Sequence, residues 1–140
     1  MRNLKGLKYF LGIEVARSKQ GIFLSQRKYI LDLLTETGML DCKPVDTPIT
    51  QNERLSIQDN QTPTDKDQYQ RLVGKLICLS HTRPDIAYVI SLVSQFMHCP
   101  YEENLEATYR ILRYLKGYSG KGLFLKKTDC RDIEVFSDIV

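Results

Sequence analysis

The N-terminal segment alternates apolar and polar positions at the spacing of a β-strand. A turn that ends in glycine, 18-SKQG-21, follows this segment, and a second apolar run, 22-IFLS-25, comes directly after the turn. Strand, turn and strand in this order predict a β-hairpin. The apolar positions of the first strand share one parity: Leu7, Tyr9, Leu11, Ile13 and Val15.

Helical spacing replaces strand spacing from Gln26 onward. Residues 26–37 predict a helix with Ile30, Leu33 and Leu34 facing inward. Gly38 stands where a helix C-cap favours glycine. Residues 41–63 hold prolines, aspartates and amides without an apolar period, so we expect a long polar loop there.

Three further helices are predicted between residues 64 and 117. The run 64-TDKD-67 is typical of a helix start, with an acidic residue at the third helical position. The run 83-RPD-85 ends that helix and begins the next, since proline suits a first turn. Pro100 opens the last helix, which Gly117 closes. The expected inward faces are Tyr69, Leu72, Val73, Leu76 and Ile77; Ile86, Val89, Ile90, Val93 and Met97; and Leu105, Tyr109, Leu112 and Leu115.

Two short strands are predicted at the C-terminal end, 122-GLFLK-126 and 133-IEVFS-137. The fold class is therefore α+β, in the order β-hairpin, helix, long polar loop, three-helix bundle and two strands. We expect the N-terminal hairpin to lack a sheet and to be marginally stable, because an isolated two-stranded hairpin is marginal in water.

Composition favours a soluble intracellular protein. The 140 residues are 42% apolar and 26% charged, which suits one compact domain or a piece of a larger one. No apolar run could span a bilayer and no signal-peptide core is present, so we expect no membrane partner. The four cysteines are irregularly spaced, which argues against a disulfide scaffold. The sequence does not distinguish cytoplasm from nucleus.

Charge is spread unevenly although its sum is only +3. Residues 1–28 hold seven Lys or Arg against one Glu, and residues 110–131 hold seven Lys or Arg against one Asp. Residues 32–68 between them hold eight acidic and three basic residues. Two basic ends would suit a polyanion held at two points, and the alternative is a solvated surface.

Three constellations could carry chemistry, and none is convincing. Cys78 and His81, with the pair 98-HC-99, have the inventory for zinc, but adjacent helical residues diverge, so we expect packed cysteines and surface histidines. Ser80 beside His81 fails as a hydrolase pair, because sequence neighbours do not face each other on a helix. Asp138 ends a strand, but one carboxylate is not a metal site. We expect no catalytic residue and no metal ligand.

The last predicted helix carries a cationic stripe. Arg110, Arg113 and Lys116 recur every third residue, which would place three cations along its outer side. Such a stripe can lie along phosphates, and the alternative is a solvated face opposite the core. Tyr114 and Tyr118 could stack on exposed bases or could complete the packing.

Several sequence blocks occur in an order that carries a family resemblance. They are 9-YFLGIEV-15, 21-GIFLSQRKYILDLL-34, 45-VDTP-48, 71-RLVGKLICLSHTRPDIAY-88, 94-SQFM-97 and 110-RILRYLKG-117. Together they closely resemble the reverse transcriptase of copia-type retrotransposon Pol polyproteins. The resemblance covers nearly the whole chain and implies a stretch from the end of the polymerase palm to the connection with ribonuclease H.

The resemblance also implies a division of the chain. Residues 1–40 would be the end of the palm, with the hairpin and its helix, and residues 41–63 a polar connecting loop. Residues 64–118 would form a thumb-like helical bundle. Residues 119–140 would supply connection strands and the truncated start of a ribonuclease H-like segment.

Departures from the family pattern bear on catalysis. The family's Tyr-x-Asp-Asp motif precedes the 9-YFLGI-13 block, and only MRNLKGLK stands there in this chain. The run 135-VFSD-138 resembles the strand with the first ribonuclease H aspartate, but Ile-Val follows instead of Ala-Asp-Trp. Asn104 replaces a common histidine. We therefore expect no polymerase or ribonuclease H activity and no cofactor, since Mg²⁺ would serve only the missing catalytic centres.

The resemblance implies that such a fragment retains the part of a reverse transcriptase that holds an RNA or DNA template–primer duplex. The palm and ribonuclease H segments of the parent polyprotein would be further partners. The alternative is a non-catalytic relic or a protein-interaction module. The expected nucleic-acid contacts, chosen by position, charge and expected exposure, are Lys8, Tyr9, Arg27, Lys28, Arg110, Arg113 and Lys116.

Overall fold

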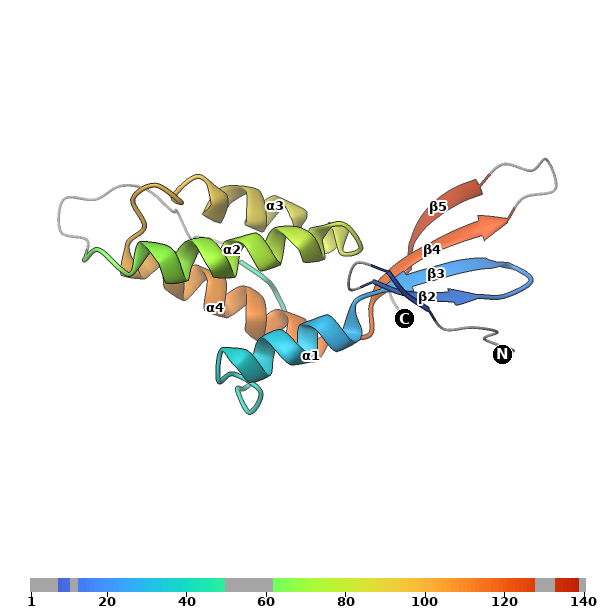
Figure 1. The fold of residues 1–140 in the computed structure, drawn as a ribbon, viewed down its shortest axis with the longest axis horizontal. Helices are drawn as coiled ribbons and strands as arrows, with labels where there is room; N and C mark the ends of the chain where they lie inside the picture. The colour runs from blue at the N-terminus through green and yellow to red at the C-terminus, as the bar shows by residue number, and fades with distance from the viewer. Residues whose placement is uncertain (1–7, 11–12, 50–61, 128–132, 139–140) are drawn as a thin grey trace.

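A computed structural model describes residues 8–10, 13–49, 62–127 and 133–138, with the backbone alone at 8–10 and 133–138. The helices gather at one end of an elongated molecule and the sheet forms the other end (Figure 1). The α+β class and the predicted order of elements are confirmed. The elements are β1 (Lys8–Phe10), β2 (Ile13–Arg17), β3 (Gly21–Ser25), α1 (Arg27–Glu36), α2 (Lys66–Ser80), α3 (Pro84–Ser94), α4 (Glu102–Gly117), β4 (Gly122–Lys127) and β5 (Ile133–Asp138).

The sheet joins strands from both ends of the chain. Its order is β1-β2-β3-β4-β5, and neighbouring strands are antiparallel. Strand β3 pairs with β4 from Gly21 opposite Lys126 to Ser25 opposite Gly122. The expectation that the hairpin lacks a sheet was therefore wrong. The hairpin is the middle of a sheet, and β4 supplies hydrogen bonds that a solitary hairpin would leave to water.

The first predicted strand is two strands. Phe10 of β1 lies opposite Ile13 of β2, so the chain reverses between them, whereas the apolar alternation predicted one continuous strand. Gly12 was a weak signal, since two-residue hairpin turns use glycine but favour Asn-Gly, Asp-Gly or Gly-X over the Leu-Gly present here. The second reversal, from β2 to β3, lies where the sequence predicted it.

The hydrophobic core lies among the helices. It takes side chains from all four of them, including Ile30, Leu33 and Leu34 of α1, which face inward as predicted. The predicted three-helix bundle thus has a fourth helix in its core. Inside it, the Tyr69 hydroxyl donates to the Val93 carbonyl at 2.5 Å and ties α2 to α3. Burial raises the pKa of Tyr69, which keeps that donor protonated.

Most of the predicted inward positions are buried. Ile77 is the clear exception, because 37% of its surface is exposed while Leu79 is fully buried. At 100° per residue Ile77 lies at the side of the α2 face, whereas Leu79 continues the line of Leu72 and Leu76. Met97, Leu105 and Tyr109 are only partly buried, at the edge of the core. In the described ranges no helix is both long and apolar enough to cross a membrane.

Helix ends follow the predicted signals closely. Helix α2 begins after Asp65, not Thr64, and the Asp65 carboxylate accepts from the amides of Asp67 at 3.0 Å and Gln68 at 3.2 Å. Pro84 stands in the first turn of α3, where its missing N–H costs nothing. Gly38 follows α1 with a φ of 75°, a conformation that strains other residues.

Gly122 is where the chain enters the sheet from the helices, and its missing side chain sets the fit of β4 against β3. A Cβ atom added at this position would overlap the Leu24 carbonyl oxygen across the strand pair. At Gly74, in the middle of α2, an added Cβ would meet nothing within 4 Å. The two glycines therefore make a matched pair for substitution.

We expect Gly122→Ala to lower the free energy of unfolding by about 1 to 3 kcal/mol, because the strands must separate to admit the methyl group. Gly74→Ala should raise it by roughly 0.5 to 1 kcal/mol, since alanine has less freedom in the unfolded chain. Urea unfolding of both variants measures the two effects. Equal stability of Gly122→Ala and the parent would contradict this strand packing.

Candidate nucleic-acid interface

A buried arginine lies where the helical body meets the sheet. Arg83 is 1% exposed and stands in the turn between α2 and α3. Its Nε and Nη2 donate to the two carboxylate oxygens of Asp85 at 3.0 and 2.8 Å. Its Nη1 donates to the carbonyl of Tyr118, just after α4, at 2.9 Å. The guanidinium thus ties the α2–α3 turn to the segment that leads into β4.

Neighbouring groups complete this junction. The Tyr114 hydroxyl donates to Asp85 at 2.6 Å, and the Tyr114 and Tyr118 rings lie 4.9 Å apart. The Nζ of Lys121 lies 4.2 Å from the centre of the Tyr118 ring. Tyr114 is buried, so of its two predicted roles the structure shows packing. Burial and the Asp85 carboxylate raise the pKa of Tyr114 to about 12.

A second contact ties α1 to the same turn. The Thr82 hydroxyl donates to the Gln26 side-chain carbonyl at 2.7 Å, and both side chains are buried. Gln26 comes directly after β3 and directly before α1. The two crossings between helices and sheet, at Gln26 and near Tyr118, are therefore both held by the α2–α3 turn.

The cationic stripe of α4 is partly covered by another segment of the chain. Residues 42–47, which we call the strap, cross the outer side of α4. Arg110 donates to the Thr47 hydroxyl at 2.9 Å and Lys116 donates to the Cys42 carbonyl at 2.7 Å. Both cations are half-buried, so the expected exposure was wrong. The cause is the polar segment after α1, which folds back onto α4.

Arg113 lies between these two cations and is also half-buried. Its Nε is shielded from solvent and has no hydrogen-bond partner. In the described part of the chain, no ion pair joins a carboxylate to Arg110, Arg113 or Lys116. These three cations are partly removed from water, and their described partners are neutral or absent. A bound anion would therefore stabilise them.

The other predicted contacts lie elsewhere. Arg27 and Lys28 are exposed in the first turn of α1, and Lys28 pairs with Asp32 at 3.5 Å. Lys8 and Tyr9 lie in β1, where the side chains are outside the described residues. The structure therefore groups Arg110, Arg113 and Lys116 on α4 and places Arg27 and Lys28 on another helix, α1.

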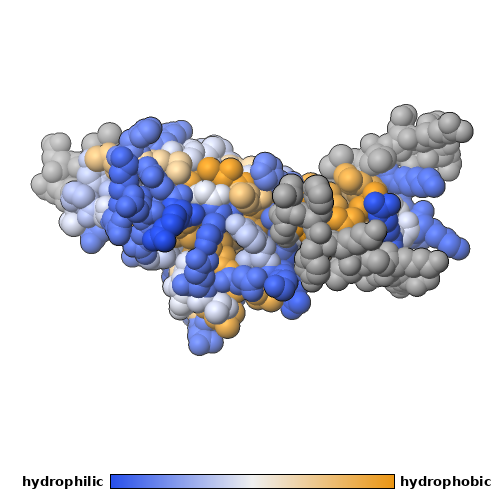
Figure 2. Space-filling model, viewed as in Figure 1, coloured by the Kyte–Doolittle hydropathy of each residue, from blue (hydrophilic) through white to orange (hydrophobic). Residues whose placement is uncertain are grey.

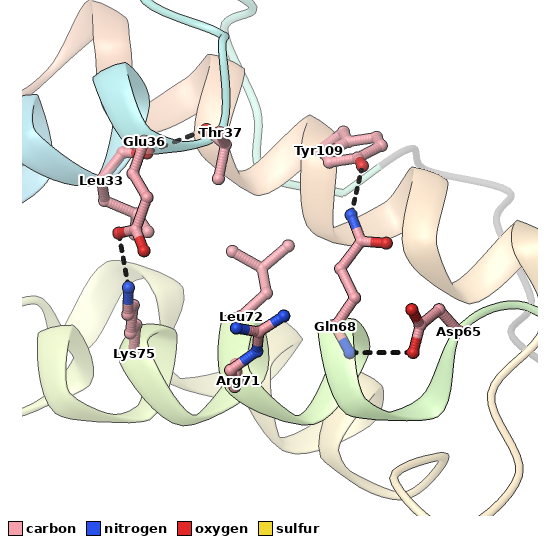
Figure 3. A pocket seen from close by; sticks show the side chains of 9 residues that line it. All are labelled: Leu33, Glu36, Thr37, Asp65, Gln68, Arg71, Leu72, Lys75 and Tyr109. Atoms are coloured by element: carbon pink, nitrogen blue, oxygen red, sulfur yellow. Dashed lines mark hydrogen bonds and ion pairs between the residues drawn. The ribbon is translucent and has the colours of Figure 1, made fainter.

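A pocket of about 400 Å³ opens between α1, α2 and α4 (Figure 3). Lys75 forms an ion pair with Glu36 across it, and Gln68 donates to the Tyr109 hydroxyl at 3.5 Å. Its lining mixes acidic, basic and apolar side chains, and some of the polar ones are already paired with one another. This arrangement shows no preference for one kind of ligand.

The Cys and His residues considered for zinc lie in two places, at the end of α2 and between α3 and α4. Within the described ranges, no three His, Cys, Asp or Glu side chains gather as metal ligands. Cys78 and Cys99 are exposed, so the expectation of packed cysteines was wrong, whereas His81 and His98 lie at the surface as predicted. The Asp138 side chain lies outside the described residues.

Comparison with curated proteins places the chain in context. It is 49% identical over 132 residues to the "Retrovirus-related Pol polyprotein from transposon RE1" of Arabidopsis thaliana, and 44% identical to that of transposon RE2. It is 38% identical over 138 residues to the "Uncharacterized mitochondrial protein AtMg00810" of the same plant. The chain is related to a segment of copia-type retrotransposon Pol polyproteins.

The alignments include most of this chain but a much smaller fraction of each relative. The alignments include 94% of this chain but 9% of the RE1 and RE2 polyproteins, and 99% of this chain but 57% of the mitochondrial protein. The chain thus spans a small part of the transposon proteins that it matches. No family model matches the sequence, and no solved structure matches it.

Sequence reasoning missed the role of Arg83 and Asp85. It assigned 83-RPD-85 to a helix boundary, which is correct, but an ion pair made by a buried arginine leaves no periodic signal. A guanidinium two residues before a carboxylate, between two apolar helices, was the available hint. Only the long-range contact with Tyr118 shows what the pair holds together.

The pKa of Asp85 predicts a pH dependence. Burial raises this pKa, but hydrogen bonds from Arg83 and Tyr114 and the charge of Arg83 outweigh burial, so it lies below the ordinary value of 3.8. A depressed folded-state pKa gives stability that is present above the unfolded value and is lost as pH falls through the folded value. Asp85→Asn should remove this contribution and leave Arg83 without its charge partner.

We expect Asp85→Asn to lower the free energy of unfolding at pH 7 by about 1 to 3 kcal/mol, because Arg83 is buried whereas the Asp85 side chain keeps 27% of its surface exposed. The difference from the parent should shrink below about pH 4, where the parent carboxylate also becomes protonated. Urea unfolding of both proteins from pH 7 to pH 3 measures this. A difference that stays constant across that range would contradict the assignment.

Proposed function

We propose that this chain is a non-catalytic segment of a reverse transcriptase-like Pol protein and holds a template–primer duplex through its phosphates. The curated relatives named as Pol polyproteins support the class of parent protein. The thumb and connection role follows from the resemblance of the sequence blocks. No Tyr-x-Asp-Asp motif occurs in these 140 residues, so nucleotide addition would require carboxylates from another segment.

The observation that supports this proposal most directly is the unpaired positive charge on α4. The Arg113 Nε is buried without a hydrogen-bond acceptor, and no carboxylate of the described residues forms an ion pair with its guanidinium. Its neighbours Arg110 and Lys116 donate to neutral oxygens, which leaves their charge uncompensated. A phosphate diester offers charge and acceptors together, and arginine binds it with good geometry.

The proposed contact is to the backbone of the duplex and not to its bases. Phosphate contacts position a protein on nucleic acid without reading sequence. Binding should therefore vary little with sequence and should depend steeply on salt, since each contact releases counterions. The proposal also includes protein partners, which are the remaining segments of the parent polyprotein.

Arg113→Ala tests this proposal, because no hydrogen bond or ion pair among the described residues depends on Arg113. We expect weaker binding to template–primer duplexes of any sequence. The slope of log binding constant against log salt concentration should be flatter by roughly 0.7 to 0.9. Titration at several salt concentrations measures both quantities. Arg71→Ala, which removes an exposed arginine from α2, is the matched control.

Unfolding curves should show that both variants retain the parent fold. Unchanged affinity and slope in a folded Arg113→Ala protein would contradict the proposal. That result would favour the alternative, a relic or protein-interaction module.

A further inference from the structure

Part of each basic segment of the chain lies at one place in the fold, the outer end of the sheet. The β2–β3 turn, residues 18–20, and the end of β4 lie side by side at the end of the sheet farthest from the helices (Figure 1). The Lys127 amide donates to the Gln20 carbonyl at 2.8 Å, which fixes the end of β4 beside the turn. Segments more than a hundred positions apart thus share one tip.

This tip, which we define as Arg17, Lys19 and Lys127, is cationic. All three side chains are exposed. Glu14, the one acidic side chain described in the sheet, accepts from the Ser25 hydroxyl at 3.2 Å and lies at the other end of β2. In Figure 2 the outer end of the sheet is blue where its side chains are described.

The backbone holds these cations in place. The Ser18 amide donates to the Gly21 carbonyl at 2.9 Å, and the Gly21 amide donates to the Ser18 carbonyl at 3.3 Å, which closes a two-residue turn with Lys19 inside it. Arg17 lies opposite Ile22, which lies opposite Leu125, two residues before Lys127. Like charges gathered on a rigid tip repel one another, and an anion with several charges would relieve that repulsion.

We propose that this tip is a second phosphate-contacting surface for a nucleic-acid duplex. The inference rests on the proposed function for its choice of partner. The tip is distinct from the α4 stripe, which belongs to the helical body. A duplex therefore has two separate cationic supports, one on the helices and one at the end of the sheet.

The alternative occupant of such a tip is an acidic protein segment. A duplex fits better because its phosphates repeat at short intervals along two strands, so three fixed cations meet several charges at once. An acidic peptide must also lose its own conformational freedom when it binds.

The test compares two triple variants of the full chain. Arg17→Ala/Lys19→Ala/Lys127→Ala removes the tip, and Lys66→Ala/Arg71→Ala/Lys75→Ala removes one arginine and two lysines from α2. We expect the tip variant to flatten the log–log salt slope for duplex binding by roughly 2 to 3, and the control to leave it near the parent value. Lys19→Glu alone, in an exposed turn, should weaken binding without affecting the fold.

The outcomes are distinct. If the parent binds duplex, and the tip variant and Lys19→Glu bind as the parent does, the tip proposal is overturned while the α4 proposal stands. If Arg113→Ala binds like the parent but the tip variant is weakened, the α4 proposal fails and the tip stands. Loss of poly-glutamate binding without loss of duplex binding would assign the tip to an acidic protein and overturn the inference. A parent that binds no duplex overturns both.

Discussion

The pairing of Arg83 with Asp85 is the interaction on which the arrangement of helices and sheet depends. Removing a guanidinium from water costs several kcal/mol, and the cost is offset only where the charge and the donors all find partners. Arg83 finds them in both Asp85 oxygens and in the Tyr118 carbonyl. Because the last partner belongs to the segment between α4 and β4, satisfying the arginine also fixes where the sheet begins.

The proposed function depends on that geometry. The junction sets the direction in which β4 leaves α4, and β4 then pairs with β3 and carries Lys127 to the β2–β3 turn. The strap folds over α4 and leaves Arg113 without a partner among the described groups. The two cationic surfaces thus belong to one folded unit. A duplex that contacts both would cost the protein little conformational freedom. Fixed positions reduce the entropy lost on binding.

Local structure was largely predictable from the sequence, and long-range structure was not. Apolar spacing and Pro84 located the helices because periodicity and capping are local signals. The continuous alternation through Gly12 concealed the reversal between β1 and β2. The pairing of β3 with β4, and the contact of Arg110 with Thr47, join residues far apart in sequence, so no local pattern announces them. For the same reason the α4 cations were expected to face solvent.

The central claim is that helices and sheet form one cooperative unit held at the junction. Native-state amide hydrogen exchange at increasing urea tests it most directly, because it reports the opening free energy of each element separately. The account predicts that the slowest amides of β3 and β4 open with the same free energy as those of α2 and α4. A sheet that opens at much lower urea than the helices, as a separate unit, would contradict it.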